Sequence, residues 1–137
     1  MADTSALQAQ ANSYANQKAQ KEREKHAIDQ KITRLRKAKN EVATEKSYVG
    51  DLRNAVRKQE KPDDAWQGQK RKQYCDYASN DFRQHYNEYY SKADDLHDAI
   101  IRKIAELENQ SRDIGGVIGW LASAINSLWA EIRAATN

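Results

Sequence analysis

Apolar side chains recur at alternating steps of four and three residues through the second half of the chain. The residues in this pattern are Tyr86, Tyr90, Ala93, His97, Ile100, Ile104, Leu107, Ser111, Ile114, Ile118, Leu121, Ile125, Leu128 and Ile132. Such a heptad spacing predicts one long helix with an apolar seam along one side. The pattern stays in phase across Gly115 and Gly116, which favours a continuous helix. A break into a third helix stays open as the alternative, because paired glycines often kink helices.

A thinner apolar stripe marks the first half of the chain. Ile28, Leu35, Val42, Val49 and Val56 recur every seven residues, which predicts a second helix. Its flanking positions are charged, so the stripe is too narrow to be stable alone. We therefore expect this helix to pack against the first pattern.

The stretch 61–68 predicts the reversal between the two helices. Pro62 lacks an amide proton and disfavours helix at the residue before it, so the first helix should end there. Asp63 or Asp64 can cap the next helix by accepting bonds from its free amides. Trp66 is then a large ring at the tip of the reversal.

These patterns together predict an all-α fold, an elongated antiparallel helical hairpin that resembles a coiled coil and carries a Trp-x-Gly turn. We expect a single domain over residues 1–137, with a first arm at 25–61, the turn at 62–68 and a second arm at 69–135. Residues 1–24 are rich in Ala, Gln and Asn and are expected to form a weakly held or frayed helical extension. Disorder of this segment is the alternative.

The register of such a hairpin leads to an expectation about partners. With the tip near residue 64, Ile28 should lie opposite residue 100, and the arm beyond residue 120 should meet only the sparse N-terminal segment. That end is nevertheless the most apolar part of the chain. We expect it to bind another helical chain, or a second copy of this one, through Ile114, Ile118, Trp120, Leu121, Ile125, Leu128, Trp129 and Ile132. The alternative is that it folds back on Leu7 and Tyr14.

The charges are distributed unevenly between the two arms. The net charge is +3, from 23 Lys and Arg against 20 Asp and Glu. Residues 1–61 carry 14 basic against 8 acidic residues, whereas residues 62–137 carry 9 against 12. Arms of opposite sign attract when they lie antiparallel, although exposed ion pairs contribute only about 0–1 kcal/mol each. The chain has neither a run of about 18 apolar residues nor the pattern of a cleaved signal peptide. We expect a cytoplasmic protein, with export by a leaderless route left open.

Groups that could carry chemistry are scattered. His26, His85 and His97 form no metal-binding pair, and Cys75 stands alone, so we expect neither a metal nor another cofactor. The carboxylates around Asp94 lie on one helix, which provides no enclosed pocket to tune them for acid–base catalysis. We expect no enzyme. Aromatic residues follow the basic run 70–72, but acidic residues share that segment, so we expect no nucleic-acid binding either.

At the predicted turn, Trp66-Gln67-Gly68 separates two amphipathic helices in a chain without a recognisable leader. In this respect the chain resembles the WXG superfamily of type VII secretion substrates and partners. In particular it is similar to the YwqH-like family, small helical proteins that accompany LXG-type toxins in Gram-positive bacteria. The resemblance covers residues 20–135.

The resemblance implies recognition of other proteins. It suggests a targeting factor that binds the N-terminal helical region of an LXG-type toxin, together with another small WXG-like protein, and presents it to the type VII secretion ATPase. Trp66 and Gly68 would take part in the export signal. Tyr77 with Asp81, and Tyr90 with Asp94, match its Tyr-x-x-x-Asp companion.

Both matches lie inside the second arm, whereas the superfamily places this signal near the C-terminus. Whether the chain is itself exported therefore stays open. The alternative function is a self-associating coiled-coil structural or scaffold protein with no role in secretion.

Overall fold

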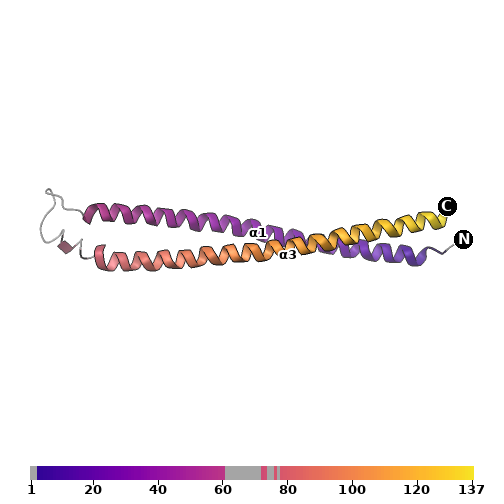
Figure 1. Cartoon of the computed structure of the whole chain (residues 1–137), viewed down its shortest axis with the longest axis horizontal. Coiled ribbons are helices and arrows are strands. Elements are labelled where there is room, and N and C mark those ends of the chain that lie inside the picture. The colour runs from indigo at the N-terminus through magenta and orange to yellow at the C-terminus, as the bar shows by residue number, and fades with distance from the viewer. Residues whose placement is uncertain (1–2, 61–71, 74–75, 77) are drawn as a thin grey trace. The chain divides into compact units, whose positions relative to one another are not determined.

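A computed structural model describes residues 3–60, 72–73, 76 and 78–137 of the chain (Figure 1). Helix α1 runs from Ser5 to Glu60, a short π-helix, η1, from Ala78 to Phe82, and helix α3 from Arg83 to Thr136. No strand occurs within these ranges. The predicted all-α class, with two helices packed against each other, is confirmed. The predicted turn at residues 62–68 lies outside the described residues.

Helix α1 begins where polar groups near the N-terminus satisfy its first amides. The backbone N–H of Ser5 donates to Asp3 Oδ1 at 2.9 Å, and this bond lowers the pKa of Asp3 below its ordinary value. The backbone N–H of Gln8 donates to the carbonyl oxygen of Thr4 at 2.8 Å, which starts the helical ladder. The helix therefore includes most of the segment that was expected to be weakly held.

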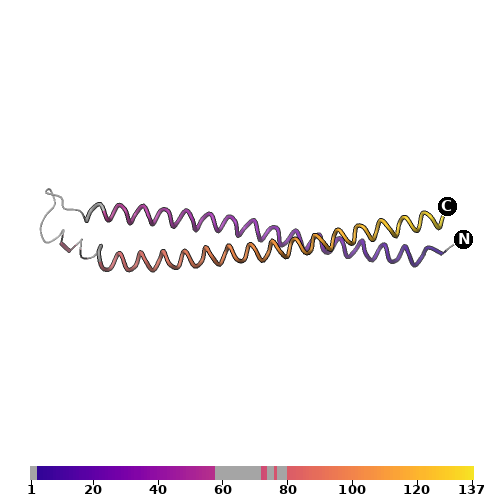
Figure 2. The backbone as a smooth tube through the Cα atoms, viewed as in Figure 1, coloured from indigo at the N-terminus to yellow at the C-terminus, as the bar shows by residue number. Residues whose placement is uncertain are grey.

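Helix α3 is continuous across Gly115 and Gly116, as the heptad phase predicts (Figure 2). Intrahelical bonds span this stretch, so the alternative of a third helix is wrong. Near the C-terminal end, the hydroxyl of Thr136 donates to the carbonyl oxygen of Ile132 at 3.0 Å and so satisfies one of the free carbonyls of the last turn.

The chain divides into two compact units. Residues 1–34 and 103–137 form one, called here the terminal unit, and residues 35–102 form the other, called here the middle unit. In the terminal unit, the N-terminal part of α1 and the C-terminal part of α3 lie side by side and run antiparallel (Figure 1). Helical segments from the same two elements also pair in the middle unit.

The core of the terminal unit comes mainly from the predicted seam of α3. Its buried side chains, each with at most 9% of its surface exposed, are Ala11, Ile32, Ile104, Leu107, Ser111, Leu121, Leu128 and Ile132. Six of these eight belong to α3, and all six occupy predicted heptad positions. The stripe of α1 supplies less, as its charged flanks led us to expect. The heptad prediction is therefore confirmed here.

The predicted register is wrong. In the terminal unit the hydroxyl of Ser111 contacts the carboxylate of Asp29 at 2.6 Å, so Ile28 lies opposite residues near 112 and not near 100.

The N-terminal segment of α1 covers part of the C-terminal end of α3. The ring of Tyr14 meets the ring of Trp120 with centroids 5.6 Å apart, and Ala11 is 1% exposed. The N-terminal segment thus packs against this end, as in the alternative that the sequence left open. The expectation that another chain also binds this end stays a prediction.

The middle unit is held together by aromatic and charged groups more than by aliphatic ones. Among the residues of this unit whose side chains the structure describes, Tyr86 and Ile100 are buried below 9% exposure. Around Tyr86 the rings of Phe82 and Tyr90 stack, with centroids 6.4 Å and 5.8 Å away respectively. Such contacts stabilise less than the burial of aliphatic residues in a dry seam.

Candidate functional site

The seam residues expected to bind a partner divide into three groups. Leu121, Leu128 and Ile132 are buried inside the terminal unit, so they stabilise the hairpin. Ile114, Ile118 and Ile125 are half-buried. Trp120 and Trp129 keep 61% and 40% of their surfaces exposed. Any partner must therefore contact mainly the flanks of the seam.

The two exposed tryptophans lie on opposite sides of α3. Nine residues separate Trp120 from Trp129, which is about two and a half turns at about 3.6 residues per turn. Ala122, Ile125 and Trp129 share one side of the helix, because they are spaced by three and four residues. The terminal unit therefore presents two different apolar surfaces.

The first surface is an open groove between α1 and α3 with a volume of about 360 Å³. Together with Trp129, which follows one turn after Ile125, we call it the Trp129 groove. Three of its lining side chains are alanines, which leave space that larger residues would fill. A salt bridge of 2.7 Å between Lys18 and Glu22 borders it on α1. The lining residues are Ala15, Lys18, Ala19, Glu22, Ala122, Ile125 and Asn126.

The second surface surrounds Trp120. The ring of Tyr14 packs against that of Trp120 at an interplanar angle of 64°, an edge-to-face arrangement. The side-chain amide of Gln10 donates to the hydroxyl of Tyr14 at 3.1 Å. Trp120 is thus held by its neighbours although most of its surface is exposed.

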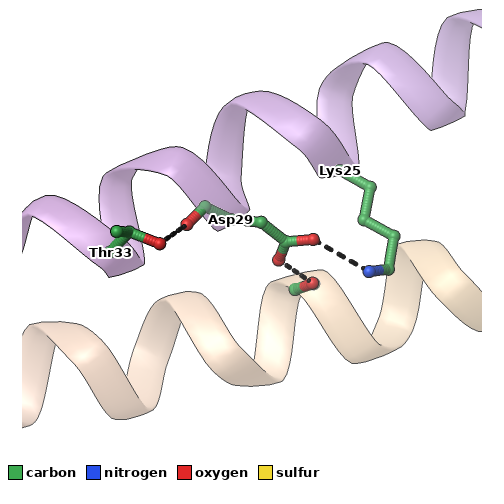
Figure 3. A network of polar contacts seen from close by, with 4 residues as sticks. Lys25, Asp29 and Thr33 are labelled. Atoms are coloured by element: carbon green, nitrogen blue, oxygen red, sulfur yellow. Dashed lines mark hydrogen bonds and ion pairs between the residues drawn. The ribbon is translucent and has the colours of Figure 1, made fainter. Parts of the chain in front are cut away.

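A polar contact inside the terminal unit fixes how the two helices align. Ser111 occupies a buried seam position, and its hydroxyl donates to Asp29 Oδ1. The other carboxylate oxygen accepts from Lys25 Nζ at 2.9 Å, and Thr33 donates to the carbonyl of Asp29 at 3.1 Å (Figure 3). The bond from Ser111, and after it the bond from Lys25, lowers the pKa of Asp29. A single polar pair in an apolar seam penalises other registers.

In the middle unit, Tyr90 and Asp94 are brought together by a residue that the sequence analysis did not single out. Lys46 Nζ donates to Asp94 Oδ1 and also lies 4.8 Å from the centre of the Tyr90 ring. The bond to Asp94 raises the pKa of Lys46 above its ordinary value. Tyr90 is 37% exposed. The predicted pair therefore forms one cluster with Lys46, on a surface that solvent reaches.

A second cation completes this aromatic face. Arg53 lies 5.0 Å from the centre of the Tyr86 ring, a cation–π contact like that of Lys46 on Tyr90. An open groove of about 430 Å³ runs along these groups. Its lining residues are Ala43, Lys46, Ser47, Gly50, Arg53, Asn54, Tyr86, Tyr90 and His97. This groove is polar, in contrast to the Trp129 groove.

Of the other predicted signal residues, the structure describes only Asp81. Trp66, Gly68 and Tyr77 lie outside the described residues. Asp81 is exposed in η1. Their roles stay predictions.

The part of the chain that the structure describes contains no group of three or more His, Cys, Asp or Glu side chains placed to hold a metal ion. His97 lies in the groove of the middle unit, with Nδ1 3.9 Å from Asp98 Oδ1. In the same part of the chain no helix combines the length and the apolar character needed to cross a bilayer.

Residues missed by the sequence analysis all depend on the register. Asp29 and Lys46 belong to a long row of charged residues on the first arm, where no local signal separates them from their neighbours. Ser111 was visible as a polar residue in an apolar seam, and such a residue needs a bonding partner. Its partner could not be named without the correct alignment of the two helices.

Comparison with known proteins gives one match. No curated protein and no solved structure resembles the chain significantly. The model of the YwqH-like family matches residues 9–130 of the 137, which include most of both helices, the Trp129 groove and the cluster around Lys46. On this coverage, the chain is a member of the YwqH-like family.

Proposed function

We propose that this chain is a non-enzymatic helical partner that binds the N-terminal helical region of an LXG-type toxin and helps to direct it to the type VII secretion system. Membership of the YwqH-like family supports the class of function. The observation that carries the proposal is the Trp129 groove, where alanines, Ile125 and Trp129 stay accessible beside the Lys18–Glu22 salt bridge after the hairpin has buried its own seam.

The groove fits an amphipathic helix better than a small ligand. It is open and shallow, and its alanine lining allows another helix to approach both α1 and α3. Helices that dock into such grooves place apolar side chains every three or four residues into the gap. Trp129 at the edge is the kind of large aromatic side chain that dominates binding energy at interfaces.

The cluster of Lys46, Tyr90 and Asp94 supports a second contact. It lies on the middle unit, apart in sequence from the residues of the groove, and presents a partly exposed tyrosine beside a paired carboxylate. In the proposal this cluster, with the residues Trp66 and Gly68 of the predicted turn, contacts the secretion ATPase while the toxin occupies the terminal unit. Another small WXG-like protein can complete the same helical bundle.

Co-expression tests the pairing with the toxin. The tagged chain is produced together with the N-terminal helical region of an LXG-type toxin encoded next to it, and the complex is isolated through the tag. We expect the two chains to elute together in gel filtration. Separate elution at matched expression would contradict the proposal.

Two tryptophan variants locate the contact. Trp129→Ala should weaken the complex by about 2 kcal/mol or more, because a buried aromatic anchor is lost. Trp120→Ala is the matched control, since it removes the same side chain from the opposite side of α3. If both variants lose affinity for the toxin region equally, or if neither does, the Trp129 groove is not the binding site. Circular dichroism checks that both variants stay helical.

A further inference from the structure

Two glycines on the outer side of α3 have no explanation inside the hairpin. A Cβ atom built at Gly116 or at Gly119 would meet nothing within 4 Å apart from the local helix. Both residues are exposed within a continuous helix, where alanine would be the better helix former. At Gly115, by contrast, the side chain of Lys25 passes 3.6 Å from the position of a Cβ. The two open glycines therefore leave a notch that this molecule itself does not fill.

The notch lies beside the most exposed tryptophan of the terminal unit. Gly116 and Trp120 are four residues apart, and Gly119 and Ser123 continue the same side of the helix. These residues, with Tyr14 packed against Trp120, are called here the Trp120 face. One surface thus combines a protruding ring with a recess about one helical turn away.

The Trp120 face also carries no charge. From Ile114 to Ala130, α3 contains no charged residue, and Tyr14 comes from a part of α1, Thr4 to Gln17, that contains none either. The charged side chain of Lys25, which is paired with Asp29, reaches Gly115 at the edge of the face. A partner that brought charged groups onto this face would have to desolvate them without a counter-charge. A second copy of the face meets no such penalty, even though each chain carries a net charge of +3.

We propose that the Trp120 face is the interface of a homodimer, in which Trp120 of each copy packs into the glycine notch of the other. A twofold interface requires one surface that is complementary to itself, so that residue i meets j and j meets i. A protrusion and a recess side by side on one uncharged surface meet this requirement. Glycine at both recess positions lets the two α3 backbones approach closely.

This interface is independent of the proposed pairing with a toxin. Trp120 and Trp129 lie on opposite sides of α3, so a dimer formed through the Trp120 face leaves the Trp129 groove open. The self-association is a property of the purified chain and needs no other protein.

Analytical ultracentrifugation of the full chain over a range of concentrations tests the proposal. We expect a reversible monomer–dimer equilibrium for the wild type. Gly119→Gln fills the notch with a side chain that is compatible with a helix, and it should raise the dimer dissociation constant more than about tenfold. Gly50→Gln is the matched control, because a Cβ at Gly50 also meets nothing within 4 Å but lies in the middle unit. This control should leave the dissociation constant unchanged.

Circular dichroism and thermal unfolding accompany each variant, so that loss of the dimer is separated from loss of the fold. Trp120→Ala should weaken the dimer as Gly119→Gln does, whereas Trp129→Ala should not. A wild-type chain that stays monomeric up to the millimolar range would overturn the proposal. A dimer that survives Gly119→Gln and Trp120→Ala would also overturn it, because the interface would then lie elsewhere. Equal loss of the dimer in the control variant Gly50→Gln would overturn it as well.

Discussion

The terminal and middle units use the same two helices, yet different interactions hold each of them together. In the terminal unit six residues of α3 are buried along the seam, and one polar pair, Ser111 with Asp29, lies among them. In the middle unit Tyr86 and Ile100 are buried, and cations stack on exposed tyrosines. The terminal unit therefore carries most of the aliphatic burial that stabilises the hairpin.

The difference extends to the surfaces. Exposed apolar residues of the terminal unit surround a groove and a notch, and no charged residue lies between Ile114 and Ala130. Exposed apolar residues of the middle unit, such as Tyr48 and Leu52, stand among charged neighbours on α1. Scattered apolar residues of that kind are normal on protein surfaces, whereas grouped ones mark interaction sites. The comparison assigns most of the aliphatic core to the terminal unit, and this unit is also the one that the proposed partners would contact.

Removing a seam leucine should show the largest contrast between the units. Leu121 is 2% exposed, so Leu121→Ala should lower the free energy of unfolding by about 2–5 kcal/mol. Leu52 is 46% exposed, and Leu52→Ala should lower it by less than about 1 kcal/mol. Urea denaturation followed by circular dichroism measures both. Similar losses in the two variants would contradict the assignment of the main core to the terminal unit.

The polar pair of the terminal unit should make its stability depend on acid. Because the bond from Ser111 lowers the pKa of Asp29 in the folded chain, the ionised carboxylate stabilises the fold above the unfolded-state pKa. That contribution is lost as the pH falls through the lowered folded-state pKa. Ser111→Ala should therefore be less stable than the wild type at neutral pH. Its melting temperature should also fall less on acidification than that of the wild type. Melting temperatures from pH 7 down to about pH 2 test this, and parallel curves would refute it.

A glycine in the middle unit should give the smallest effect. A Cβ at Gly50 meets nothing within 4 Å, so Gly50→Ala should raise the free energy of unfolding by about 0.5–1 kcal/mol through helix propensity alone. The same denaturation experiment measures the change. A loss of stability would contradict this, because it would show that the groove lined by Gly50 has no room for an added methyl group.

The sequence predicted correctly which side of a helix is buried, because a periodic pattern determines that. It did not predict contacts that depend on how the two helices are aligned. Leu121, Leu128 and Ile132 follow from spacing alone, because a heptad pattern specifies which side of a helix is buried. The contact between Asp29 and Ser111 depends on how one helix is aligned along the other, and the alignment expected from the sequence put Ile28 opposite residue 100 instead.

The sequence could name the region of the proposed binding surface but not which of its side chains are exposed. The sequence indicated the C-terminal end of α3, yet it could not separate buried Leu121 from exposed Trp129, because both belong to one apolar cluster in the sequence. The alanines of α1 that line the groove carry no signal of their own. Lys46 became visible only when the fold placed it beside Tyr90 and Asp94.

Hydrogen exchange of the full chain, free and bound to the toxin's N-terminal helical region, tests the central claim most directly. The account predicts that binding slows exchange at residues 15–22 and 122–129, which border the Trp129 groove, and leaves residues 43–54 of the middle unit unchanged. Slowed exchange confined to the middle unit would contradict this account. So would unchanged exchange in both units when the toxin region is present in excess.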